Sequence, residues 1–189
     1  MPRRQRSAPS HPFFCVPKIR FIDTPKETHA MDALDATTHD DDAEQREADA
    51  VIARLGMCRH VEGGYYVTAN KIAAEVGTDR APCSVIYFLL TRGQKSHWHR
   101  LDATEVWFWH LGSPLEITVS NTGERVDDVH VLGPDLAAGQ NPQVVVAKNA
   151  WQTARPLGGW ALVSCMMAPQ FAWSGFTLAP PDWTPGTAI

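Results

Sequence analysis

Apolar and polar residues alternate with a period of two along most of this chain, and this is the period of a β-strand. From residue 65 onward, short segments rich in valine, isoleucine and aromatic residues are separated by glycine, proline, asparagine and aspartate. Segments of this length and spacing predict an all-β sandwich or barrel. The predicted strands are 65–74, 83–91, 96–101, 104–110, 114–120, 128–132, 143–147, 151–156, 160–168 and 175–178.

One short helix is predicted ahead of the strands. Val51 and Leu55 recur at helical spacing, and Gly56 is suited to end a helix. Asp42 and the aspartates before it can cap a helix and interact favourably with its positive N-terminal dipole. We therefore predict a helix over 43–55.

Length and composition indicate one domain with additional segments at its ends. The chain has 189 residues, of which 44% are hydrophobic and 20% are charged, as in an average soluble domain. A basic, proline-rich stretch followed by an acidic one predicts a poorly ordered leader over 1–42. It is a bland leader, an extension upstream of a true start at Met31, or an arginine-rich targeting peptide. We predict a single domain over 43–180 and a C-terminal tail over 181–189.

Charge, hydropathy and cysteine spacing exclude several classes of protein. The formal net charge is −4 at pH 7 and the sequence pI is about 6.0, which argues against a nucleic-acid-binding protein. No apolar run approaches the ~18–20 residues that a membrane span needs. The cysteines are widely spaced and form no CxxC pair, so we predict free thiols and a cytoplasmic location. They are Cys15, Cys58, Cys83 and Cys165.

Two histidines and a glutamate form the most informative group of side chains. In a strand, His97 and His99 share one face, and the next strand can bring Glu105 beside them. Two imidazoles and one carboxylate form the facial triad of non-haem iron, and the same set suits zinc, manganese or nickel. The alternative is a pair of half-exposed surface histidines.

Other polar and aromatic residues near this group have two possible roles each. The hydroxyl of Tyr65 or Tyr66 can act as an acid or a hydrogen-bond donor, or both rings can belong to the core beside a tight turn. Trp107 and Trp109 either stack on a ligand ring or pack inside the barrel. Arg100 either anchors an anionic group at the barrel mouth or lies in solvent.

A longer pattern around the two histidines resembles a known family. Gly93, His97, His99, Glu105 and Gly112 have a spacing similar to the first motif of the cupin superfamily. Further segments are similar to the small single-domain cupins of the cupin-5 branch, a domain of unknown function. The similarity spans about 45–178 and rests on segments 62–66, 86–90, 96–100, 112–115, 132–135, 151–152 and 158–163.

This resemblance implies a double-stranded β-helix, or jelly roll, with a ligand cavity inside the barrel, and commonly a homodimer. Structural relatives of the branch include sugar-nucleotide epimerases. Gln152 stands where the second cupin motif usually has a third histidine. The implied site therefore binds a divalent iron, manganese, nickel or zinc ion through His97, His99, Glu105 and Gln152.

These observations favour a cupin-barrel protein that binds a small molecule, either as an enzyme or without catalysis. The first hypothesis is a metal-dependent isomerase or epimerase for a sugar-like or keto compound, in which a side chain moves a proton. The alternatives are a metal-dependent oxygenase, a metal-free epimerase with a histidine base and a tyrosine acid, and a non-catalytic binding protein. Candidate catalytic residues are His97, Glu105 and Tyr65, and candidate substrate-binding residues are Trp107, Trp109, Arg100 and Tyr66.

Overall fold

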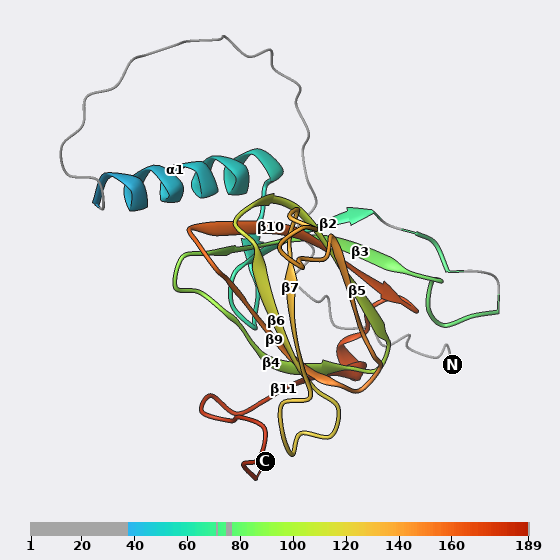
Figure 1. Ribbon diagram of the computed structural model, residues 1–189. Coiled ribbons are helices and arrows are strands. Elements are labelled where there is room, and N and C mark those ends of the chain that lie inside the picture. Colours follow the sequence, from blue (N-terminus) through green and yellow to red (C-terminus); the bar gives the residue numbers. More distant parts are fainter. Residues whose placement is uncertain (1–37, 71, 75–76, 189) are drawn as a thin grey trace.

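Two antiparallel β-sheets face each other in the computed structural model, which describes residues 38–70, 72–74 and 77–188 (Figure 1). The elements are α1 (Thr38–Leu55), β1 (Cys58–Arg59), β2 (Tyr65–Asn70), β3 (Ser84–Thr91), β4 (Ser96–Leu101), β5 (Thr104–Gly112), β6 (Leu115–Ser120), β7 (Asp128–Leu132), β8 (Gln143–Val146), β9 (Trp151–Pro156), β10 (Trp160–Ala168), the 3₁₀ helix η1 (Trp173–Gly175) and β11 (Phe176–Leu178).

The strands of the described residues are arranged in a six-stranded and a five-stranded sheet. The first sheet has the order β1-β2-β3-β10-β5-β8, and the second has the order β11-β4-β9-β6-β7. Strands far apart in the sequence are therefore neighbours, such as β3 with β10 and β4 with β9. This winding of one chain between two facing sheets is a jelly roll, so the predicted all-β, double-stranded β-helix is confirmed.

The predicted strands are all present, with ends that differ by a few residues. The largest difference is in β2, predicted over 65–74, which ends at Asn70. Its pairing with β3 shifts register between Thr68 and Asn70, and such a shift interrupts the hydrogen-bond ladder. Strand β1 is absent from the prediction because two residues are too few to show a period.

Apolar side chains from both sheets fill much of the space between them. Phe88 and Trp107 of the first sheet, and Leu115 and Ile117 of the second, are each exposed by 1% or less. Burying one such side chain stabilises the fold by about 1.5–3 kcal/mol. This core fixes the strands from which the polar residues of the site project.

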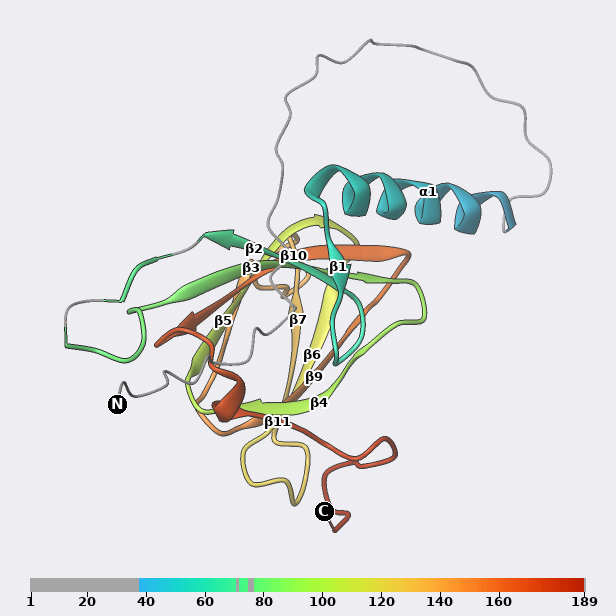
Figure 2. The ribbon, with the colours of Figure 1, turned by 180° about the vertical axis from the view of Figure 1, so that it is seen from behind.

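Helix α1 lies against the outer side of the first sheet (Figure 2). It begins at Thr38, before the predicted start at residue 43, and the additional turn contains aspartates, which are favourable near a helix N-terminus. Ala48 is fully buried in the cluster that also contains Trp160. The Trp160 indole N–H donates to Glu47 Oε2 over 3.4 Å. The helix thus covers apolar surface that the sheet would otherwise expose.

The predicted leader lies mostly outside the described residues. Residues 1–37 are not described, and residues 38–42 belong to α1. No helix within the described ranges combines the length and the apolar composition needed to cross a membrane.

The C-terminal segment packs on the barrel through one tryptophan of the predicted tail. Trp183 is 4% exposed, and its ring lies 5.7 Å from that of Trp98 and 4.5 Å from that of Trp151, between ring centroids. These residues form a small hydrophobic cluster on the second sheet. The tail over 181–189 therefore contributes a buried side chain to the fold.

Candidate functional site

A cavity of about 410 Å³ lies between the two sheets. Its lining comes from the turn between β1 and β2 and from strands of both sheets, and it includes an aromatic wall near η1 and β11. A volume of this size suits a small molecule. The lining residues with titratable side chains are His60, Glu62, Tyr66, His99, Glu105 and Cys165.

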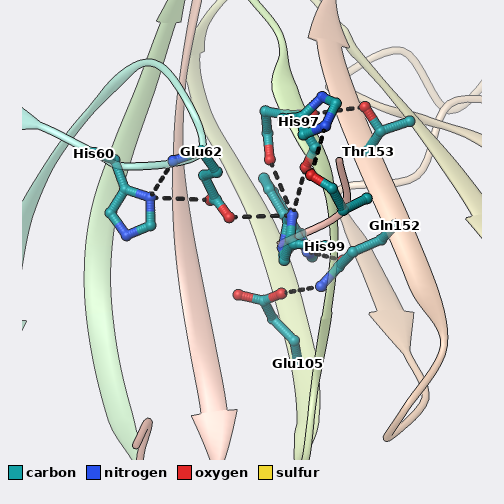
Figure 3. Close-up of polar contacts among 10 residues, drawn as sticks. His60, Glu62, His97, His99, Glu105, Gln152 and Thr153 are labelled. Atoms are coloured by element: carbon teal, nitrogen blue, oxygen red, sulfur yellow. Dashed lines mark hydrogen bonds and ion pairs between the residues drawn. The ribbon is translucent and has the colours of Figure 1, made fainter. Parts of the chain in front are cut away.

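Glu62 lies between two imidazoles (Figure 3). Its Oε1 is 3.4 Å from His60 Nδ1, and its Oε2 is 3.1 Å from His99 Nδ1. The turn that carries Glu62 packs closely on the chain before β4, because a Cβ on Gly63 would lie 2.4 Å from the Lys95 carbonyl oxygen. Gly63 also has a φ of 108°, which a residue with a side chain rarely adopts. The tight turn therefore fixes Glu62 in the cavity.

The hydrogen bonds of His99 define its tautomer. Its Nδ1 is 2.8 Å from the carbonyl oxygen of His97, and a carbonyl only accepts hydrogen bonds. The proton of the neutral ring is therefore on Nδ1, and Nε2 carries the lone pair. Burial lowers the pKa of His99, so the ring is neutral at pH 7 and has the lone pair of a base.

Glu105 is held by Gln152 on the opposite sheet. The amide Nε2 of Gln152 donates to Glu105 Oε2 over 2.5 Å, and its Oε1 accepts from the Trp107 indole N–H over 3.0 Å. Because an indole can only donate, the amide oxygen of Gln152 must face Trp107 and its NH₂ group must face Glu105. All three side chains are at least nine-tenths buried, so this orientation is fixed within the fold.

Burial shifts the protonation of the two carboxyl groups towards the neutral form. It raises the pKa of Glu62 to about 8 and, with the charge of Glu62 adding to the effect, the pKa of Glu105 to about 7. Burial lowers the pKa of His60 to about 4, with His99 adding to the effect. The contacts of Glu62 with its two imidazoles therefore belong to a neutral cluster near pH 7 and are not ion pairs.

Comparison with known families places this site in a cupin barrel. Residues 49–179 match the sequence model of Cupin_5, described as a family of the cupin superfamily and also called DUF985. The chain belongs to this family. The predicted resemblance to the cupin-5 branch is therefore confirmed, and it covers the whole barrel with the end of α1.

Solved structures from two organisms are similar to this chain over most of its length. An X-ray structure of a protein from Shewanella oneidensis is 38% identical, covers 70% of this chain and 84% of its own, and superposes with a TM-score of 0.65. A hypothetical protein from Leishmania major is 28% identical over 72% of this chain and 89% of its own, also with a TM-score of 0.65. Oxalate decarboxylase from Bacillus subtilis is 12% identical over 64% of this chain and 29% of its own, with a TM-score of 0.49. No curated protein matches the chain.

The expectation that His97 and His99 share a face of this cupin strand is wrong. Ser96 pairs with Ala154 and His99 with Gln152, so two residues of β4 lie opposite one residue of β9. Such a β-bulge breaks the alternation of faces. His97 Nε2 therefore lies 3.2 and 2.9 Å from the carbonyl oxygens of residues 179 and 180, and Ser96 takes its place beside His99, with Oγ 3.4 Å from Nδ1.

The two predicted tyrosines are separated by the alternation of β2. Tyr66 lines the cavity, with its ring 4.8 Å from that of His60. Tyr65 points to the other face, where it packs with the cluster under α1 and lies 4.2 Å beneath the guanidinium of Arg59. Tyr66, rather than Tyr65, is therefore the tyrosine that a bound molecule can contact.

The remaining predicted binding residues lie outside the cavity lining. Arg100 is exposed and lies over the ring of Trp151, 4.9 Å from its centroid. Trp107 is buried in the core, where it supports Gln152. The Trp109 indole N–H donates to the carbonyl oxygen of Ser113 over 3.2 Å. These tryptophans thus pack inside the barrel, and Arg100 covers its outside.

His60, Glu62 and the aromatic residues near β11 line the cavity but are not among the site residues predicted from the sequence. Glu62 immediately precedes two glycines, and a charged residue fixed by a tight turn at the entrance to a strand is a usable signal. His60 has no such signal, because only the hairpin between β1 and β2 brings it to the cavity.

The structure does not assemble the four-ligand metal site that the resemblance implies. His97 reaches the C-terminal segment, and the amide oxygen of Gln152 accepts from Trp107. Only His99 and Glu105 of the expected ligands line the cavity. In the described part of the chain, no group of three or more histidine, cysteine, aspartate or glutamate side chains is arranged to hold a metal ion, and every buried side-chain nitrogen and oxygen has a hydrogen-bond partner. The residues present therefore do not fit the expected divalent ion.

Proposed function

We propose that this cupin domain catalyses proton transfer, as an isomerase or epimerase, on a sugar-like or keto compound bound in the cavity, without a metal ion. The observation that carries the proposal is the placement of His99 and Glu105 in one buried cavity. His99 Nε2 has the lone pair of a neutral base, and the pKa of Glu105 is raised to about 7 by burial. A catalytic acid or base is most effective when its pKa lies near the working pH.

His99 and Glu105 come from different sheets, so they can act on opposite sides of a bound substrate. This arrangement supports removal of a proton on one side and its return on the other. His99 is on β4 of the second sheet and Glu105 is on β5 of the first. In an epimerisation, one group removes a proton from the carbon beside a carbonyl and the other returns a proton to the opposite side. The hydrogen bond from Gln152 holds one oxygen of Glu105 in place, which orients the carboxyl group for this role.

Another cavity residue is suited to stabilise the enolate that forms when the carbon loses its proton. A developing oxyanion is stabilised by preorganised hydrogen-bond donors in a site from which water is excluded. The hydroxyl of Tyr66, which lines the cavity, is such a donor.

Two alternatives predicted from the sequence, the metal-dependent isomerase and the oxygenase, require a set of metal ligands. His97 and Gln152 contact other groups instead of contributing to such a set. The metal-free epimerase needs only groups that line the cavity. Of Tyr65 and Tyr66, either of which could be its acid on the sequence alone, only Tyr66 lines the cavity, and in this proposal Glu105 takes the role of the acid. A binding protein without catalysis is the outcome to be expected if proton transfer is not observed.

Exchange of substrate protons with solvent tests the proposal without knowledge of the natural substrate. Dihydroxyacetone, phenylacetone and aminoacetone would be incubated with the protein in D₂O, and deuterium incorporation would be followed by NMR. We expect exchange of at least one of them above the buffer rate, and a loss of ~100-fold or more in His99→Gln and Glu105→Gln.

Matched control variants lie outside the cavity. His110→Gln and Glu116→Gln alter a histidine on β5 and a glutamate on β6 that are not among the lining residues, and both should exchange like the wild type. Exchange no faster than in buffer for all three compounds, or equal rates in wild type and His99→Gln, would overturn the proposal.

A further inference from the structure

The described lining of the cavity contains two carboxyl groups, those of Glu62 and Glu105, and no lysine or arginine. Arg80 lies next to the lining residue Gln170 and donates to its carbonyl oxygen over 2.6 Å. Its guanidinium is already paired with Asp102, over 2.8 and 3.1 Å. A phosphate or carboxylate on a ligand would therefore face these carboxyl groups in the described part of the lining, and burying an anion without a partner is costly.

One side of the cavity is an aromatic wall formed by Phe171, Trp173 and Phe176. Their ring centroids are 4.9 to 6.0 Å apart. The ring of Phe176 lies 5.8 Å from that of His99, so the wall begins beside the candidate base. Trp173 is 51% exposed and its ring is nearly parallel to that of His60 (16°). The wall thus extends from the polar cluster to the cavity mouth and offers aromatic faces to a ligand.

Acidic side chains next to aromatic faces form an environment for an organic cation. An ammonium group is attracted to the faces of tryptophan, tyrosine and phenylalanine, and the attraction is stronger when the group is removed from water. A carboxyl group buried without a cation is destabilised in its charged form, and a bound ammonium supplies the missing charge. An uncharged ligand would use the wall but not the two carboxyl groups in this way.

We propose that the substrate of the proton transfer is a keto compound that also carries an ammonium group and a flat apolar part. The ammonium group lies near Glu62 and Glu105, and the apolar part packs on the wall of Phe171, Trp173 and Phe176. The keto group of this substrate rests on the proposed function, whereas the charge and shape of the substrate are inferred from the cavity lining alone.

Three probes of the same shape and different charge test the inference by binding alone. Phenethylamine, 2-phenylethanol and phenylacetate share a phenyl ring on a short chain and are respectively cationic, neutral and anionic near pH 7. Dissociation constants would be measured by ligand-observed NMR titration. We expect phenethylamine to bind ~10-fold or more tightly than 2-phenylethanol, a difference of about 1.4 kcal/mol, and phenylacetate to show no saturable binding. Equal or tighter binding of either other probe would overturn the inference.

Variants separate the two parts of the proposed subsite. Glu62→Gln and Glu105→Gln should each reduce the preference for phenethylamine and leave 2-phenylethanol binding within about twofold, whereas Glu116→Gln, outside the cavity, should keep the preference. Trp173→Ala changes a half-exposed side chain outside the buried core. It should weaken phenethylamine and 2-phenylethanol together. An unchanged preference in both glutamate variants would refute the carboxyl part, and unchanged binding in Trp173→Ala would refute the wall.

The outcomes for binding and for catalysis are distinguishable. Amine-selective binding without deuterium exchange in any keto probe would overturn the proposed catalysis and leave the ligand charge and shape in place. Deuterium exchange of dihydroxyacetone or phenylacetone by a protein that does not prefer phenethylamine would overturn the proposed ammonium group of the substrate. The proposed proton transfer would then still stand.

Discussion

Gln152 donates a hydrogen bond to Glu105 from the opposite sheet of the barrel. The other end of the same amide accepts from Trp107, so Gln152 connects the candidate catalytic carboxyl to the core. The side chain implied as a metal ligand is thus a positioning residue for Glu105.

Replacement of Gln152 by alanine should destabilise the protein. Glu105 would lose its amide donor and the buried Trp107 N–H would lose its acceptor, and an unsatisfied buried polar group costs about 1–3 kcal/mol. Urea unfolding should show a decrease of this size in the free energy of unfolding. Gln143→Ala is the matched control, because Gln143 is exposed on β8, and it should unfold like the wild type. A Gln152→Ala variant as stable as that control would contradict the positioning role.

The stability of the protein should decrease between pH 6.5 and 8.5. Burial raises the pKa of Glu62 to about 8 and that of Glu105 to about 7 in the folded state, while a glutamate in the unfolded chain titrates near 4.3. The folded state therefore keeps protons that the unfolded state has released, and the free energy of unfolding falls as pH rises until both carboxyls ionise. Urea unfolding at the two pH values should differ by roughly 1–3 kcal/mol.

The histidines do not reverse this trend in the chosen interval. The pKa of His60 is lowered to about 4 by burial, so it reduces stability only when the pH falls below about 6.5, where the unfolded imidazole takes up a proton. Glu62→Gln should show a smaller decrease between pH 6.5 and 8.5, and Glu116→Gln should show the wild-type decrease. A wild-type stability that rises over this interval would contradict the buried, neutral state of the carboxyls.

Removal of divalent metal ions should leave the fold intact. His97 and Gln152 are committed to other partners, so no ion is expected to connect the strands. Protein dialysed against EDTA should have the melting temperature of untreated protein, and element analysis should find far less than one iron, manganese, nickel or zinc ion per chain. One equivalent of a metal that is lost in His99→Gln would instead support the ligand set implied by the resemblance.

Trp183 should be essential for the docking of the C-terminal segment. Its ring is buried against Trp98 and Trp151, and truncation of a buried tryptophan to alanine typically costs about 3–5 kcal/mol. At roughly 2–4 °C per kcal/mol for a chain of this size, the melting temperature of Trp183→Ala should drop by about 6 °C or more. Hydrogen exchange of residues 179–187 should also become faster. Trp173→Ala, which removes a half-exposed ring, is the control for loss of a tryptophan.

Local patterns determined the elements of this fold. The period of two from residue 65 onward identified the strands because each pleat places alternate side chains on opposite sides, and this is a property of neighbouring residues. The helix was identified in the same way, apart from its first turn. The resemblance to cupins then supplied the double-stranded β-helix, whereas the order of the strands within each sheet came from the structure. The predicted homodimer and cytoplasmic location stay predictions.

Only the tertiary structure decided which side chains share the cavity. The bulge between Ser96 and His99 appears when β4 pairs with β9, and it turns His97 outward although His97 and His99 have the spacing of a shared face. His60 and Glu62 reach the site because a hairpin folds over the barrel, and Gln152 points its oxygen at Trp107 because the two sheets meet there. These relationships join residues that are distant in sequence, so the composition of the site depends on strand pairing and on packing between the sheets, which no local period encodes.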